Sequence, residues 1–187
     1  TQSTNAMITC LVTDPCGRTI FDSKGGIIIV PSAASIRANT ITKPGTDRST
    51  GVSEVLKFGG SGIGPGLFTD NRHIGVDSSG VIYCAEYQGG RIQIFDASGK
   101  FVSQWSAGDN AVVRDMAVSR DGVVYILDVK GISAFEGSTG KLRRKVERRF
   151  LTGLSVLTDG RVIASGRSGI EILSISLDTI VELKDAA

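Results

Sequence analysis

Short apolar runs alternate with polar, glycine-containing turns along most of the chain. Runs of about four to six residues, with turn signals every 8–12 residues or so, are typical of an all-β sandwich, barrel or propeller. One phrase of this pattern occurs four times, most plainly over 77–95, more weakly over 120–135 and 158–173, and in degenerate form over 14–30. Such self-similarity indicates one small β unit used repeatedly, and it favours the propeller among these folds.

The turn glycines of the four copies are Gly17, Gly80, Gly122 and Gly160, at intervals of 63, 42 and 38 residues. The last two intervals match one four-stranded propeller blade of about 40–50 residues. The longer first interval predicts an insertion over 31–52. We expect a mobile surface loop there, or alternatively an arm that binds a partner.

Each copy predicts four strands, and the whole chain, 1–187, is expected to form a single propeller domain. The innermost strands are predicted at 11–13, 73–76, 115–118 and 153–156, and the outermost at 54–58, 100–105, 142–146 and 179–183. The turn glycines should supply the positive φ that hairpin turns require. The resulting blades cover about 8–58, 68–106, 112–147 and 151–184.

Four motifs carry a family resemblance: the glycine-rich run 58–68 and the segments Ile74-Gly-Val-Asp77, Gly80-Val-Ile-Tyr83 and Arg91-Ile-Gln-Ile-Phe95. Together they resemble NHL-repeat proteins, strongly over 58–105 and more weakly elsewhere. The resemblance implies a β-propeller, usually of six blades. This chain supplies only four. A compact four-bladed ring lies within the range that propellers adopt but is unusual for this family. We therefore expect that the chain is part of a larger propeller, or that another chain completes the ring through exposed blade edges. The resemblance also favours an extracellular or cell-surface location, although no signal peptide is visible.

The resemblance places ligands on the face formed by the loops that enter the first strand and join the second to the third. Arg72 and Arg114 lie one repeat apart and should stand side by side near the central channel. They could clamp a carboxylate or phosphate, or pair with Asp115, Glu86 or Asp128 to hold blades together. The remaining candidates on this face carry mixed charge, which suits recognition of a protein: Glu86, Tyr87, Asp128 and Arg167.

A basic run covers 141–149 and contains six cationic residues: Lys141, Arg143, Arg144, Lys145, Arg148 and Arg149. Some NHL proteins bind RNA on a basic face, so RNA binding is one interpretation. No aromatic residues interleave with the run to stack bases, and the net charge is only +2. We therefore expect a solvated outer edge that resists aggregation, and no nucleic-acid partner.

The sequence offers little for catalysis or metal binding. His73 is the only histidine, and no paired Cys or His spacing is present. Cys10 and Cys16 lie too far apart along an extended strand and its turn for a disulfide, and Cys84 is expected in the core. No apolar run approaches the roughly 20 residues that span a bilayer. We expect no metal and no cofactor.

The leading functional prediction is a non-enzymatic binding or assembly module that presents its loop face to a protein or an extracellular ligand. Self-association through blade edges is part of this prediction. A lyase or hydrolase that acts on a small anionic substrate through Arg72 and Arg114 is the alternative. RNA binding through 141–149 is a second alternative.

Overall fold

A computed structural model describes residues 11–15, 18–23, 26–30, 56–167 and 169–183. The described residues form four antiparallel sheets of four strands, and each strand pairs with the next one in the chain. We call these sheets blades 1 to 4. Blades 1 and 2 are formed by β1 (Leu11–Thr13), β2 (Thr19–Ser23), β3 (Gly26–Val30), β4 (Leu56–Phe58), β5 (Asn71–Val76), β6 (Ile82–Glu86), β7 (Arg91–Phe95) and β8 (Phe101–Ser106). Blades 3 and 4 are formed by β9 (Asp115–Val118), β10 (Val123–Leu127), β11 (Gly131–Glu136), β12 (Leu142–Glu147), β13 (Leu151–Val156), β14 (Val162–Gly166), β15 (Gly169–Leu173) and β16 (Thr179–Leu183).

The predicted all-β class and four-stranded repeat are confirmed. The turn glycines behave as expected, because Gly80, Gly122 and Gly160 have φ values of 82°, 81° and 88°. The predictions for the turn at Gly17, for the insertion 31–52 and for Cys10 and Cys16 all lie outside the described residues. Within the described ranges, no helix has the length and apolar character needed to cross a membrane.

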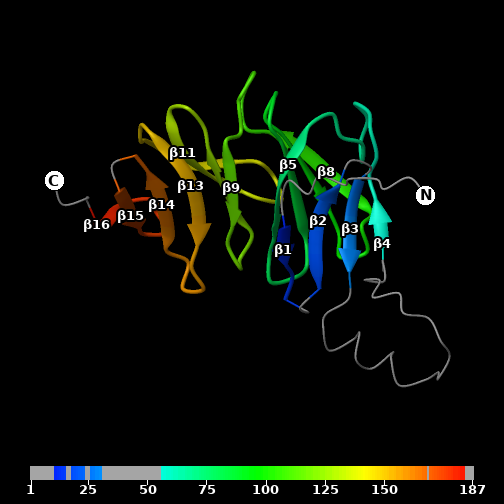
Figure 1. Ribbon diagram of the computed structural model, residues 1–187, viewed down its shortest axis with the longest axis horizontal. Coiled ribbons are helices and arrows are strands. Elements are labelled where there is room, and N and C mark those ends of the chain that lie inside the picture. Colours follow the sequence, from blue (N-terminus) through cyan, green and yellow to red (C-terminus); the bar gives the residue numbers. More distant parts are fainter. Residues whose placement is uncertain (1–10, 16–17, 24–25, 31–55, 168, 184–187) are drawn as a thin grey trace, which may run out of the picture.

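The blades stand in a row, with the inner strand of each sheet facing the inner strand of the next (Figure 1). β5 packs on β1 and β2, β9 packs on β5, and β13 packs on β9. The row does not close on itself in this view, since blade 1 and blade 4 lie at opposite ends (Figure 1).

Three apolar seams between successive blades make up the core, because alternate side chains of a strand point to opposite faces. Cys84 is completely buried in the seam between blades 1 and 2, as the sequence predicted. The ring of Phe95 lies in the same seam, 4.8 Å from that of Phe58 and 5.9 Å from that of Phe101. In the next seam Trp105 stacks on Phe135 at 5.0 Å. These contacts fix the angle between blades and therefore the positions of their loops.

Candidate functional site

The loops predicted to form the binding face do meet at one end of the blades. Because successive strands run in opposite directions, the loops before each inner strand and the loops between second and third strands emerge at the same end. These segments are 59–70, 87–90, 107–114, 128–130 and 148–150. The candidate site is built on this loop face.

The glycine-rich loop 59–68 is fixed by side chains of β7. Arg91 donates from Nη1 to the carbonyl of Ile63 at 2.6 Å and from Nη2 to that of Leu67 at 3.0 Å. Gln93 accepts the N–H of Gly66 at 2.7 Å and donates to the Leu67 carbonyl at 2.7 Å. The polar residues of the Arg-Ile-Gln motif therefore pair with the backbone of the loop that precedes their own blade. Gln93 is completely buried, so its amide would be costly if it were left unpaired.

Glu86 is placed differently from its predicted role on the binding face. Its side chain is buried, and its carboxylate accepts the N–H of Thr69 at 2.5 Å, the hydroxyl of Thr69 at 2.9 Å and Nε of Arg91 at 2.6 Å. Burial by itself would raise the pKa of Glu86, but these hydrogen bonds outweigh it and hold that pKa below its ordinary value. All three of these hydrogen bonds come from the protein itself, so Glu86 holds the loop before blade 2 in place.

Arg72 is exposed, but its guanidinium is occupied within its own blade. Nε lies 2.9 Å from Oδ1 of Asp70, and the guanidinium carbon lies 3.9 Å from the centre of the Tyr87 ring. This is a cation–π contact combined with an ion pair. The sequence predicted that Arg72 would clamp a ligand or pair with Asp115, Glu86 or Asp128. The partner found is Asp70.

A hollow of about 600 Å³ lies on the loop face where blade 3 meets the loop into blade 4. We call it the Arg114 hollow, and six residues line it: Arg114, Val129, Lys130, Glu147, Arg149 and Phe150. Three of them are cations and one is an acid. Val129 and Phe150 are apolar yet 58% and 68% exposed. The hollow therefore combines positive charge with exposed apolar surface.

Phe150 is held in an unusual backbone conformation, with φ at +65°. Bulky residues with positive φ are rare, and such strained positions concentrate at functional sites. The carbonyl of Phe150 accepts the N–H of Arg167 at 3.1 Å. This bond ties the loop before blade 4 to the loop between β14 and β15, while the ring stays exposed.

Asp128 shapes the turn that carries two of the lining residues, Val129 and Lys130. Its Oδ1 accepts the N–H of Lys130 at 2.6 Å and that of Gly131 at 2.9 Å, and its Oδ2 lies 3.7 Å from Nζ of Lys145. The sequence had grouped Asp128 and Arg167 with Arg114 as ligand contacts. The structure brings Arg114 and Arg149 into the hollow and leaves the other two beside it.

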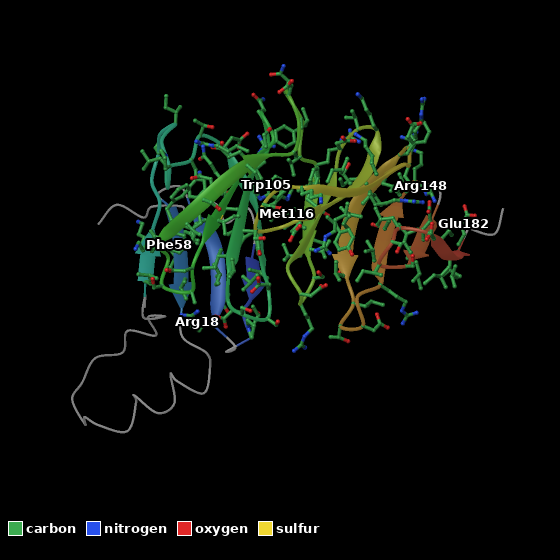
Figure 2. The ribbon with its side chains drawn as sticks, turned by 180° about the vertical axis from the view of Figure 1, so that it is seen from behind. Arg18, Phe58, Trp105, Met116, Arg148 and Glu182 are labelled. Carbon is green, nitrogen blue, oxygen red and sulfur yellow. The ribbon has the colours of Figure 1, made fainter. Side chains whose placement is uncertain are left out.

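The basic run forms β12 and the loop after it, and half of its cations pair with acids. Arg144 lies 3.2 Å from Asp178, and Arg148 lies 3.0 Å from Glu171 and also donates to the Thr179 hydroxyl at 2.9 Å. Figure 2 shows Arg148 and Glu182 at the blade 4 end of the molecule. These pairs tie β12 to blade 4, which leaves less of the run free to bind phosphates.

His73 has a partner that the sequence did not reveal. Its Nδ1 lies 3.5 Å from Oδ1 of Asp115, whose Oδ2 accepts the N–H of Leu154 at 2.7 Å. Burial would raise the pKa of Asp115, but hydrogen bonds from His73 and from the N–H groups of Leu154 and Met116 hold it below its ordinary value. These contacts link the three inner strands β5, β9 and β13. No group of His, Cys, Asp and Glu side chains that could hold a metal occurs among the described residues.

No protein-family model and no curated protein matches the chain. Solved structures do match it. U3-55K aligns with a TM-score of 0.71 at 15% identity, over 96% of this chain and 52% of that one. Hydrazine synthase of Kuenenia stuttgartiensis aligns at 0.65 and 10% identity, over 97% and 51%. The WD40 domain of Neurospora crassa Pan2 aligns at 0.64 and 12% identity, over 95% and 52%.

At these identities the similarity concerns the fold alone. The chain spans about half the length of these solved structures. Its four antiparallel sheets match propeller folds such as the WD40 domain.

Proposed function

We propose that the chain is a binding module of the propeller type, resembling NHL repeats, whose Arg114 hollow binds an acidic segment of a partner protein. The observation that carries this is the lining of the hollow, in which Arg114, Lys130 and Arg149 surround the exposed Val129 and Phe150. Arginine and aromatic residues are the side chains most enriched where protein interfaces gain their energy. A segment with carboxylates beside an apolar side chain would complement both features.

The structure gives the lyase or hydrolase alternative less support. That reaction was assigned to Arg72 and Arg114 acting together, but Arg72 does not line the hollow and is engaged by Asp70 and Tyr87. The RNA-binding alternative also has less support, because Arg144, Lys145 and Arg148 form ion pairs within the protein. We therefore retain the protein-binding proposal.

Binding of fluorescein-labelled peptides, followed by fluorescence polarisation, tests the proposal. The probes are an Asp/Glu-rich peptide with one central Leu or Trp, the same peptide with Ser in that place, and a single-stranded RNA of equal charge. The proposal predicts that the peptide with the apolar residue binds most tightly, the Ser peptide less tightly and the RNA least tightly. Arg114→Ala should weaken the first by about 10- to 100-fold, because a hydrogen bond to a charged group contributes roughly 1.5–3 kcal/mol.

Arg120→Ala is the matched control. Arg120 is exposed like Arg114, but it lies in the turn between β9 and β10, at the opposite end of the blades. It should leave peptide affinity unchanged. Equal losses in the two variants would mean that the peptide responds to overall charge and not to the hollow. RNA binding that exceeds peptide binding, and that disappears in an Arg143→Glu, Arg144→Glu variant, would favour the nucleic-acid alternative.

A further inference from the structure

The face of blade 4 that points away from blade 3 is apolar, and much of it is exposed within the part of the chain that the structure describes. It carries Ile163, Ile170, Ile172, Val181 and Leu183, which pair across β14, β15 and β16. Ile170 is 44% exposed and Leu183 57%. We call this surface the open face of blade 4, and Figure 1 places the blade at one end of the row.

The same positions are buried in the two preceding blades. Strand register aligns Ile170 with Ile92 and Ile132, which sit at the start of the third strand in their own blades and are completely buried. In blades 2 and 3 these residues lie in the seam with the next blade. The open face is therefore the first half of one more inter-blade seam.

The opposite end of the row offers the second half. In blade 1, Ile27 and Ile29 are completely buried against blade 2. Ile28, between them on β3, points to the other face of the sheet and is only half-buried. Every seam in the molecule joins such a pair of unlike faces, one from each blade.

We infer that the open face of blade 4 binds blade 1 of a second copy of this chain. A contact between unlike faces closes into a ring when the rotation between copies allows it. In each of the three seams a face like the open face of blade 4 meets a face like the one that carries Ile28, so two copies related by a two-fold rotation would join through two identical seams. A second copy is the occupant we propose because the two new seams would repeat the geometry of the three seams already present in each copy.

Light scattering across a concentration series tests this inference, with Ile170→Lys and Ile28→Lys as the two variants. Wild type should have twice the chain mass of 19.6 kDa. Each variant should raise the dissociation constant at least ~10-fold, because each places a charge in both seams. Val102→Lys, on β8 of blade 2 at an aliphatic residue 58% exposed, is the matched control and should remain dimeric.

Mixing the two variants distinguishes the proposed contact from other dimers. A mixed pair has one seam with both substitutions and one with neither, so mixing should restore dimers at concentrations where each variant alone is monomeric. A cooperative thermal unfolding transition in each variant would show that it still folds, as expected at positions already partly exposed. A monomeric wild type overturns the inference. So does a dimer indifferent to Ile28→Lys, which would indicate a contact between two blade 4 faces, or a failure of the mixed variants to associate.

Discussion

Replacing Glu86 by Gln should release the glycine-rich loop 59–68. The carboxylate accepts two hydrogen bonds from Thr69 and one from Arg91. A Gln side chain has one acceptor oxygen, and its NH₂ group would face a donor. The substitution also leaves the charge of Arg91, whose side chain is 19% exposed, without its counter-ion.

The size of the effect follows from the burial of this pair. Removing one partner of a buried ion pair costs about 3–5 kcal/mol. The lower end, about 3 kcal/mol, applies here because Arg91 keeps its bonds to the carbonyls of Ile63 and Leu67. For a domain of this size that corresponds to a fall in Tm of roughly 6–12 °C. Calorimetry measures the fall, and hydrogen exchange of residues 59–68 shows whether the loop is the part released.

The effect should also depend on pH in a known direction. The folded-state pKa of Glu86 lies below its ordinary value of 4.5, so its contribution is present above that value and is lost as pH falls through the folded pKa. Wild type and E86Q should therefore differ most near neutral pH and converge in acid. Asp70→Asn is the control, since the exposed Asp70–Arg72 pair contributes less than about 1 kcal/mol. A Tm for E86Q no lower than that of D70N, or a difference that persists undiminished well below pH 4, would refute the reasoning.

Three further predictions concern single side chains. Asp115→Asn should lower the free energy of unfolding by about 1–3 kcal/mol in urea denaturation, because it interrupts the contacts from His73 through Asp115 to Leu154 that link three inner strands. A change smaller than about 0.5 kcal/mol would contradict this. Asn71 is buried, and its amide atoms have no hydrogen-bond partner among the described residues. Asn71→Leu should therefore leave Tm unchanged or raise it in thermal melts. Gln93→Met, by contrast, should lower Tm, because it leaves the N–H of Gly66 and the carbonyl of Leu67 without their Gln93 partner. Phe150→Gly should raise stability by up to about 1 kcal/mol by relieving the positive φ, yet weaken the apolar-containing peptide; a variant that loses both stability and binding would show that the ring is structural.

The repeat itself could be predicted from the sequence because packing and turn chemistry impose it. Apolar residues such as Ile92 and Ile132 recur because they fill the same place in successive seams. Glycines such as Gly80 recur because the turn needs positive φ. Each requirement acts within one blade or between neighbouring blades. It therefore recurs once per blade and can be recognised from the regular spacing of these residues in the sequence.

The polar contacts could not be predicted in the same way, because their partners lie on different elements. Glu86 was interpreted as an exposed loop residue because the second strand was expected to end at Ala85. In the structure Glu86 is the last residue of β6 and turns inward to Thr69 and Arg91. Its signal was present in the Arg91-Ile-Gln motif, where two polar residues in a buried strand needed partners. Phe150 gave no such signal, because nothing in a sequence marks an aromatic residue that will adopt positive φ.

Specificity should accordingly lie where the repeat breaks. Arg72 and Arg114 hold equivalent positions. Of the two, Arg114 lines the Arg114 hollow, together with Val129 and Phe150 from the loops around it. Around Arg72, the corresponding loop supplies Tyr87, whose ring covers the guanidinium. The arginine before the inner strand is thus repeated in blades 2 and 3. The residues of the surrounding loops determine whether its guanidinium is occupied within the blade or available to a partner. Variation among the loops, on seams that stay constant, would let one scaffold carry one binding site and several closed positions.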